Sequence, residues 1–301
     1  MKIIGPDELL FAVDDLAGCH QFLQDYGLKP VPLSGGRTRY EALDGTAIVT
    51  CRQDDPGLPP PLSPTATLRE TVHGVVDVAT LESIRNELAR DREVRRAADG
   101  SLHTVDDTGF AIGFQVTRRR EVAAPRAATP VNHVAVEPDR PITPRTLSHV
   151  VYFVPDSAKA ERFYVERLGF RVTDRFSHVG PFMRPSGTQE HHTIFFIQTP
   201  PFMQGVEHFA FHLDSGSDVL LAGTRFANKG YQSFWGPGRH LFGSNWFWYF
   251  NSPLGCKIEY DAEMDLHDDG WQPRERPMSA DNAQLFLFTP RPKWMPGGRP
   301  E

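Results

Sequence analysis

The chain has 301 residues, of which 40% are hydrophobic and 23% are charged, and its formal net charge is -6. This composition is typical of a globular protein with room for one large domain or two ordinary ones. The negative charge and the lack of a long basic run argue against nucleic acid as a partner.

The cysteines and the hydropathy of the chain indicate the cellular compartment. Cys19, Cys51 and Cys256 are an odd set without CxxC spacing, so they predict neither a disulfide framework nor a zinc site. The N-terminal segment has acidic residues where a signal peptide would need an apolar core. No stretch approaches the ~18 consecutive apolar residues of a membrane helix. We therefore expect a cytoplasmic protein with reduced thiols and no contact with a membrane.

The predicted elements occur in repeats. Residues 11–31 read as an apolar strand, an Asp, a helix with one apolar face and a Gly that ends the helix, and residues 152–172 repeat this order. A second unit, a strand with a His followed by an Asp and a helix, recurs at 71–88 and 206–226, and each copy precedes a hairpin. Repeats of this kind predict four βαβββ modules, two in each half of the chain.

Duplicated βαβββ modules are the building plan of the vicinal oxygen chelate superfamily, which the chain resembles. The resemblance implies an α+β fold of two tandem domains, each with two βαβββ modules that form an open mixed β-barrel. We expect a degenerate N-terminal domain without metal at 1–120, a linker at 121–145 and a catalytic, metal-binding domain at 146–264. The tail at 265–301 is expected either to cover the site or to be disordered, with a short strand or lid near 285–288.

Three predicted strands of the second half carry side chains that bind metals. His149 lies in RTLSHVVYFV, His208 in GVEHFAFHL, and Glu259 follows a Pro-x-Gly turn in NSPLGCKIEY. Two imidazoles and one carboxylate leave coordination positions open, which suits non-haem Fe(II) that handles O2 and a chelating substrate. Each residue alone is more simply an ordinary strand residue, so their joint placement carries the hypothesis. The same ligands bind Mn(II), Zn(II) or Ni(II), and we expect Fe(II), with Mn(II) as the weaker alternative.

The first half serves as an internal comparison. An offset of 141 residues puts Glu8 opposite His149, and we align His73 with His208 and Gly113 with Glu259. Because this alignment retains one strong ligand, His73, and has lost the carboxylate at the position of Glu259, we expect the first half to hold no metal. His73 is then a core or surface histidine.

The second half resembles the two-domain type I extradiol dioxygenases more specifically. The string GPGRHLFGSNWFWYFNSPLGCKIEY and the block EHHTIF match signature blocks of that family. The resemblance implies that His192 is the acid–base histidine, that His240 donates a hydrogen bond to the substrate oxygens, and that Tyr249 is the partner of the substrate hydroxyl at the metal. It also implies a catechol-type substrate, O2 as the second substrate and a homo-oligomer. Without the resemblance, Tyr249 would read as a core aromatic.

The loop at 176–185 lies where that family builds its substrate pocket. From this loop and the aromatic strands we expect these residues to bind substrate: Phe176, His178, Phe182, Met183, Trp235, Arg239 and Asn245. The mostly apolar set suits a biaryl or alkyl catechol. Arg184 or Arg239 could instead pair with a substrate carboxylate, although a solvent-exposed loop charge is the simpler interpretation.

Two other functions stay open. One is a metal-dependent isomerase or lyase of the glyoxalase type, and the other is a non-catalytic protein that binds an aromatic compound. The missing carboxylate opposite Glu259 argues against the first. The acid–base and donor side chains of His192, His240 and Tyr249 argue against the second, because simple binding does not need them.

Overall fold

The computed structural model describes residues 1–124, 129–291 and 296. Strands and helices follow the modular order expected from the repeats. The first half contains β1 (Ile3–Ala12), α1 (Leu16–Tyr26), β2 (Lys29–Pro32), β3 (Thr38–Glu41), β4 (Ala47–Cys51), β5 (Leu68–Val75), α2 (Val78–Leu88), β6 (Arg95–Arg96), β7 (Leu102–Val105) and β8 (Ala111–Val116), with a 3-10 turn at Ser34–Gly36.

The second half repeats this order at slightly greater length. It contains β9 (Thr146–Val154), α3 (Ser157–Arg162) with a π-helical turn (Phe163–Arg167), β10 (Arg171–Ser177), β11 (Gly180–Arg184), β12 (Ile194–Gln198), a 3-10 turn (Pro201–Met203), β13 (Gly205–His212), α4 (Gly216–Asn228), β14 (Ser233–His240), β15 (Trp246–Asn251) and β16 (Lys257–Ala262). Across the described ranges, no helix is both long and apolar enough to cross a membrane.

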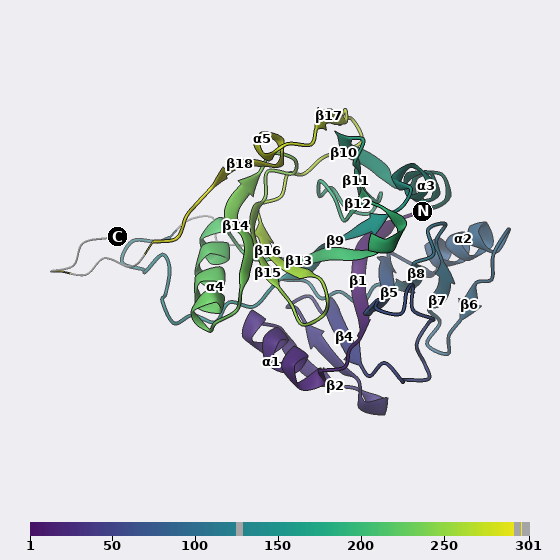
Figure 1. Cartoon of the computed structure of the whole chain (residues 1–301), viewed down its shortest axis with the longest axis horizontal. Coiled ribbons are helices and arrows are strands. Elements are labelled where there is room, and N and C mark those ends of the chain that lie inside the picture. Colours follow the sequence, from purple (N-terminus) through teal and green to yellow (C-terminus); the bar gives the residue numbers. More distant parts are fainter. Residues whose placement is uncertain (125–128, 292–295, 297–301) are drawn as a thin grey trace.

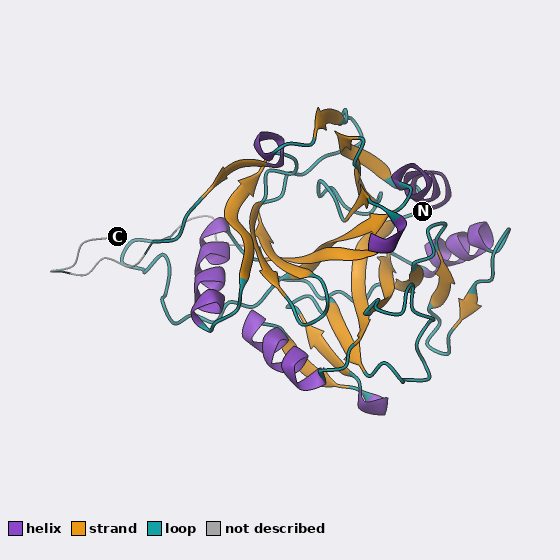
Figure 2. Cartoon of the chain, in the orientation of Figure 1, coloured by secondary structure: helices purple, strands orange, loops and turns teal. Residues whose placement is uncertain are grey.

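Each half folds into one mixed sheet. The order is β2-β3-β4-β1-β5-β8-β7-β6 in the first sheet, and β10-β11-β12-β9-β13-β16-β15-β14 forms the same pattern within the second. In both, the first strands of the two modules pair antiparallel at the centre, β1 with β5 and β9 with β13. Figure 2 shows the second sheet strongly curved, with α4 on its outer side. The predicted α+β architecture of paired βαβββ modules is confirmed.

The tail adds a further part to the second sheet. Residues 265–288, called the C-terminal strap below, contain β17 (Arg274–Pro277), α5 (Ala280–Ala283) and β18 (Gln284–Leu287). β17 pairs with β10 at one edge of the sheet and β18 pairs with β14 at the other. The strap therefore links the two edges of the curved sheet, as the yellow segment in Figure 1 shows. The strand expected near 285–288 is confirmed, and residues 292–295 and 297–301 of the predicted tail lie outside the described residues.

The first half supports the strand that carries Glu259. The rings of Tyr26 and Tyr260 stack with their centroids 4.0 Å apart. The Tyr26 hydroxyl donates to the backbone carbonyl of Glu259 at 2.6 Å, and the Tyr260 hydroxyl donates to the carbonyl of Tyr26 at 2.8 Å. Helix α1 thus holds β16 from below through two buried hydrogen bonds and one aromatic stack.

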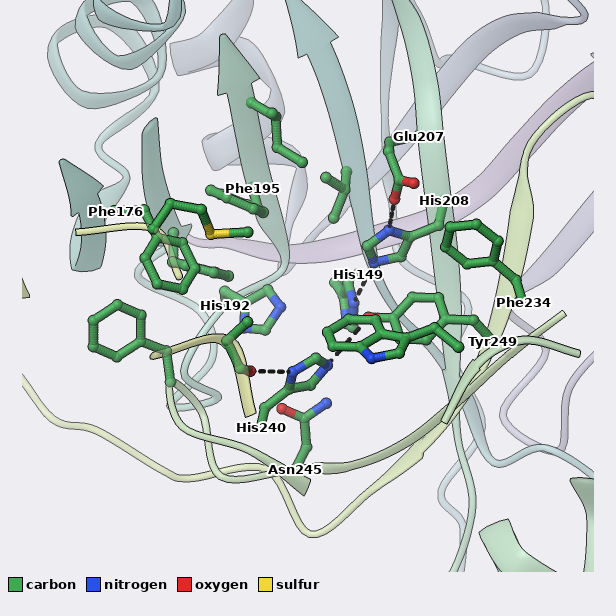
Figure 3. A pocket seen from close by; sticks show the side chains of 17 residues that line it. His149, Phe176, His192, Phe195, Glu207, His208, Phe234, His240, Asn245 and Tyr249 are labelled. Carbon is green, nitrogen blue, oxygen red and sulfur yellow. Dashed lines mark hydrogen bonds and ion pairs between the residues drawn. The ribbon is translucent and has the colours of Figure 1, made fainter. Parts of the chain in front are cut away.

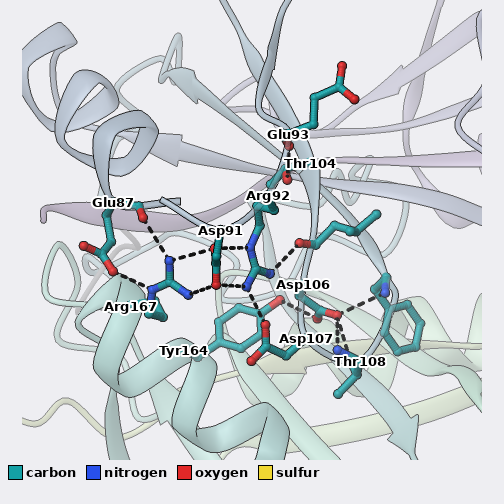
Figure 4. A network of polar contacts seen from close by, with 12 residues as sticks. Glu87, Asp91, Arg92, Glu93, Thr104, Asp106, Asp107, Thr108, Tyr164 and Arg167 are labelled. Carbon is teal, nitrogen blue, oxygen red and sulfur yellow. Dashed lines mark hydrogen bonds and ion pairs between the residues drawn. The ribbon is translucent and has the colours of Figure 1, made fainter. Parts of the chain in front are cut away.

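A polar network joins the halves at another point. Arg167, on the π-helical turn of the second half, bonds Asp91 at 2.9 Å and also contacts Glu87, both in the first half. Asp91 also accepts from Arg92 at 3.0 Å (Figure 4). These side chains are partly exposed, so the network contributes more to the orientation of the halves than to their stability.

The strand register corrects one part of the sequence alignment. His149 faces Ala210 and Ala210 faces Glu259, while in the first half Glu8 faces Val72 and Val72 faces Gly113. The counterpart of His208, two residues before Ala210, is therefore Glu70, two residues before Val72. The alignment of His73 with His208 is wrong by three residues. Since three is odd, His73 points to the opposite face of its strand.

His73 lies in the core between the halves. Its side chain is 0% exposed and its ring is surrounded by Phe114, Tyr164 and Phe170. Neither ring nitrogen has a hydrogen-bond partner among the described residues. Burial, with a smaller contribution from Arg119, lowers the pKa of His73 to about 4.

Replacement of His73 by Leu tests this account. An unpartnered buried polar group costs about 1–3 kcal/mol, so we expect the free energy of unfolding at pH 7 to stay level or to rise by about 1 kcal/mol. As the pH falls below 6.5 towards 4, His73 binds a proton in the unfolded chain but not in the folded chain. The free energy of unfolding therefore decreases. Urea denaturation at several pH values should show a smaller decline for His73→Leu. An equal decline in both proteins would contradict the assignment.

Gly27 and Gly169 provide a matched pair of helix ends. Both have positive φ, 112° and 74°, which costs about 1 kcal/mol for a residue with a side chain. A Cβ on Gly27 would also lie 2.6 Å from the carbonyl oxygen of Ile142, whereas a Cβ on Gly169 would meet no atom within 4 Å. We expect Gly27→Ala to lower the free energy of unfolding by about 2–3 kcal/mol and Gly169→Ala by about 1 kcal/mol. Equal losses would show that the approach of Ile142 to the helix end is of no consequence.

Candidate metal centre and aromatic cavity

Three side chains of the second sheet converge on one point. Nε2 of His149 lies 3.1 Å from Oε2 of Glu259 and 3.3 Å from Nε2 of His208, and Nε2 of His208 lies 3.4 Å from the same oxygen. They come from β9, β13 and β16, which are neighbours in the sheet. Within the described part of the chain, this is the group of three His, Cys, Asp or Glu side chains that could hold a metal ion.

The geometry and electrostatics of this group fit a divalent cation. Ligands at about 2.1 Å on one face of an octahedron lie about 3 Å apart, close to the observed separations. Glu259 is 0% exposed, and neither of its oxygens accepts a well-formed hydrogen bond within the described ranges. Burial alone would raise the pKa of this carboxyl, yet His149 and His208 hold it well below its usual range. A buried anion between two imidazoles is a site that a cation would stabilise.

A second set of contacts orients the two imidazoles. Glu207 contacts Nδ1 of His208, and its side chain turns to the same side because β13 has a bulge at this point. Ser148 lies 2.9 Å from Nδ1 of His149 and donates to Asp261 at 3.1 Å. Nε2 of each histidine therefore faces Glu259. This is the orientation expected of metal-binding histidines whose Nδ1 makes a hydrogen bond to another group. Burial opposes a charged His208, but Glu207 raises its pKa to about 9, so a metal ion would compete with a proton.

His149 and His208 line an aromatic cavity of about 210 Å³ (Figure 3), whereas Glu259 contacts both histidines without lining the cavity. Its walls are mainly apolar, and Phe182 and Phe195 stack at 3.9 Å within them. The lining residues are His149, Val151, Phe176, Phe182, His192, Phe195, Ile197, Glu207, His208, Phe234, Trp235, His240, Phe242, Asn245, Tyr249, Met278 and Ala283.

His192, His240 and Tyr249 all lie beside the ligands. The rings of His149 and His192 are 4.3 Å apart, and Nε2 of His240 lies 3.1 Å from the Tyr249 hydroxyl and 3.6 Å from Oε1 of Glu259. Nδ1 of His240 lies 3.0 Å from the carbonyl of Ala283 in the C-terminal strap. Since a carbonyl can only accept, Nδ1 carries the hydrogen. Burial and the nearby Glu259 raise the pKa of Tyr249 well above its usual range, so it remains a phenol.

The predicted substrate residues divide into two groups. Phe176, Phe182, Trp235 and Asn245 line the cavity. His178 lies exposed in the β10–β11 turn, Met183 is 0% exposed in the main core, and Arg239 pairs with Glu263 at 3.0 Å. None of these last three lines the cavity, nor does Arg184, which bonds Asp269 at 3.0 Å. Period-2 alternation explains Met183, which points away from the face of Phe182.

Several lining residues were missed from the sequence. Val151, Phe195 and Ile197 could have been found by alternation, because they share strand faces with His149 or with one another. Glu207 was obscured by the bulge that turns it beside His208. Met278 and Ala283 come from the strap, and no local signal connects them with the site.

The family comparison covers the part of the chain that holds the centre. Residues 146–260 match the model of the Glyoxalase/Bleomycin resistance protein/Dioxygenase superfamily. The similarity to that superfamily thus covers the second half of the chain and leaves the first half unmatched. The match contains all three candidate ligands as well as His192, His240 and Tyr249.

Curated relatives match a similar stretch. Metapyrocatechase 2 of Cupriavidus necator is 35% identical over 124 residues, which are 41% of this chain and 38% of that protein. A biphenyl-2,3-diol 1,2-dioxygenase of Paraburkholderia xenovorans is 30% identical over 131 residues, 42% of this chain and 43% of that protein. The matched region thus spans less than half the length of these relatives.

Solved structures share the fold over nearly the whole chain. A Mn(II)-bound glyoxalase from Novosphingobium aromaticivorans has a TM-score of 0.77 at 20% identity and covers 98% of this chain and 97% of its own. The 2,3-dioxygenase LapB from Pseudomonas sp. KL28 has a TM-score of 0.74 at 20% identity and covers 91% of this chain and 97% of its own. At this identity the likeness establishes the two-domain fold alone.

Metal content tests the ligand set. We expect His149→Ala, His208→Ala and Glu259→Ala each to weaken binding of a divalent ion by more than about 100-fold, and Glu207→Gln by about 10-fold because it only orients a ligand. His73→Leu, a buried histidine outside the centre, should bind like the parent chain. Calorimetric titration of metal-free protein measures all five. Full affinity in any alanine variant would remove that residue from the set.

Proposed function

We propose that the chain is an extradiol dioxygenase, which opens a catechol-type ring beside its two hydroxyls and inserts both atoms of O2. The observation that carries this proposal is that His149 and His208, which converge with Glu259, line an apolar cavity together with His192, His240 and Tyr249. The names of the curated relatives support it. We propose Fe(II) as the ion; both an iron-dependent relative and a Mn(II)-bound structural neighbour occur.

A divalent ion held by the triad would supply a Lewis acid that binds the substrate oxygens and O2 in open positions. The protein's own groups would manage the protons. His192 would take a proton from a substrate hydroxyl, because its ring lines the cavity beside His149. The Tyr249 hydroxyl, 3.1 Å from Nε2 of His240, would contact the substrate oxygens.

Asn245 supplies a further polar group for the substrate. It is 0% exposed, it lines the cavity, and neither atom of its amide has a partner among the described residues. An unpartnered buried amide costs about 1–3 kcal/mol. A substrate oxygen that bonds this amide would recover part of that cost.

The charge of the cavity favours a neutral ring substituent. None of its lining residues is Lys or Arg, and Glu207 adds a negative charge. Part of the cavity wall is a cluster of four phenylalanines, Phe176, Phe182, Phe195 and Phe242. A carboxylate there would be buried without a partner, which is strongly unfavourable. We therefore propose a catechol with an aryl or alkyl substituent, and not the carboxylated catechol that the sequence also allowed.

Other expectations stay predictions. Glu70 lies 2.7 Å from His103, and Gly113 stands in the register position of Glu259, which supports a first half without metal. A homo-oligomer is supported by the exposed apolar side chains of Leu285, Phe286 and Leu287. The cytoplasmic location rests on the sequence.

Oxygen uptake by anaerobically Fe(II)-loaded protein tests the function. With a panel of neutral and carboxylated catechols, we expect stoichiometric uptake with a yellow ring-opened product. We expect kcat/KM for aryl- and alkyl-catechols to exceed that for carboxylated ones by at least about 10-fold. Mn(II)-loaded protein in parallel identifies the productive ion. No uptake despite one bound metal per chain would contradict the dioxygenase and favour an isomerase or lyase, and a preference for carboxylated rings would contradict the neutral substituent alone.

A further inference from the structure

A line of buried polar side chains runs from the cavity to the C-terminal strap. Nδ1 of His192 lies 2.9 Å from Nδ1 of His191. Nε2 of His191 lies 2.8 Å from Oδ2 of Asp174 on β10. Arg274 on β17 donates to both oxygens of Asp174, with its backbone N–H at 2.8 Å and its Nη2 at 2.5 Å. His191 and Asp174 are each 0% exposed, so this line is closed to solvent along its middle.

The direction of these hydrogen bonds is fixed by Asp174, the acceptor at the far end of the line from the cavity. Burial would raise the pKa of Asp174, but hydrogen bonds from His191 and Arg274 keep it below its ordinary value, so the side chain is a carboxylate that can only accept. Nε2 of His191 must therefore carry a hydrogen. Burial lowers the pKa of His191, although Asp174 opposes the shift, and the ring is neutral near pH 7. Its Nδ1 then has no hydrogen and can only accept.

The same argument reaches His192. Because Nδ1 of His191 accepts, Nδ1 of His192 must donate. A neutral His192 then has a bare Nε2, which has no partner in the described part of the chain. Its ring projects into the cavity beside His149 (Figure 3). Without the hydrogen bonds to His191 and Asp174, a neutral His192 could adopt either tautomer. The tautomer with its hydrogen on Nε2 could not accept a proton at that nitrogen.

We propose that Asp174 and His191 are positioning residues that keep the hydrogen of His192 on Nδ1 and leave Nε2 free to accept a proton from the substrate, and that Arg274 of the C-terminal strap holds Asp174 in place. The inference rests on the proposed function, since it assigns His192 its working tautomer. In the step, a substrate O–H bond breaks and an N–H bond forms at Nε2. The imidazolium that results still donates from Nδ1 to His191, and Asp174 stabilises its charge through that ring.

The strap adds an orienting contact on the other side of the cavity. The carbonyl of Ala283 accepts from Nδ1 of His240 at 3.0 Å. Arg274 also lies 5.1 Å above the ring of Phe242 and 5.0 Å above that of Trp271. One segment, at both edges of the sheet, thus contacts His240 directly and reaches His192, the other cavity histidine outside the candidate triad, through Asp174 and His191.

The first experiment observes the tautomer and needs no turnover. In the full chain with 15N-labelled histidine, loaded with diamagnetic Zn(II), nitrogens with and without hydrogen differ in 15N chemical shift. We expect His192, assigned by the loss of its signals in His192→Asn, to carry hydrogen on Nδ1 and none on Nε2. In Asp174→Asn we expect a hydrogen to appear on Nε2 in part of the molecules. A wild-type His192 with hydrogen on Nε2 would overturn the proposal, even if Asp174→Asn does not fold.

The second experiment measures kinetics with Fe(II)-loaded protein. Asp174→Asn keeps the shape of the side chain, and we expect kcat to fall about 10- to 100-fold, with metal content unchanged and KM altered by less than about threefold. Glu161→Gln is the matched control: it also removes a carboxylate paired with an Arg, here Arg175 of β10 at 2.8 Å, but outside the line. Its kcat should be unchanged. Full kcat in Asp174→Asn would overturn the proposal. If the parent chain oxidises no catechol, the proposed function fails while the 15N spectrum still decides the tautomer.

Discussion

The buried carboxylate of Glu259 sets the requirement that the rest of the second half meets. A carboxylate removed from water is stable only beside compensating charge or donors. Two imidazole nitrogens lie 3.1 and 3.4 Å from its oxygen, and a divalent ion among them would complete the compensation. The central strands bring these three groups together because β9, β13 and β16 are adjacent and their register aligns the residues. The first half contributes from outside, through the hydrogen bond from Tyr26 to the backbone of Glu259.

Polar and apolar side chains occupy different parts of the cavity beside this centre. His192, His240 and Tyr249 lie beside the three candidate ligands, Asn245 lies next to His240 (Figure 3), and four phenylalanines form part of the apolar wall. In such a site a hydrogen bond or a charge acts more strongly than in water, because few solvent dipoles compete. The same environment would disfavour a charged substituent. The proposed chemistry and the proposed substrate preference therefore follow from one arrangement.

The strap makes the second sheet different from a simple copy of the first. The first sheet ends at β2 and β6, whereas β17 and β18 extend both edges of the second. Its Arg274 reaches His192 through Asp174 and His191, and its Ala283 contacts His240. A segment without candidate metal ligands thus contacts the groups to which we assign the proton transfers.

The sequence by itself determined the modular order, the strap's last strand and the three residues that converge as the candidate metal centre. Each of these depends on short-range signals: helix-ending glycines, alternation along strands, and His and Glu at fixed places in a repeat. Only the tertiary structure decided which of the expected side chains, such as Met183 and Arg239, point away from the cavity. It also decided that Glu70, and not His73, occupies the first-half position equivalent to His208. It also decided that Arg274 would stand beside Asp174, a hundred residues earlier. Strand pairing and bulges fix these contacts, and they depend on partners distant in the chain, which no local pattern encodes.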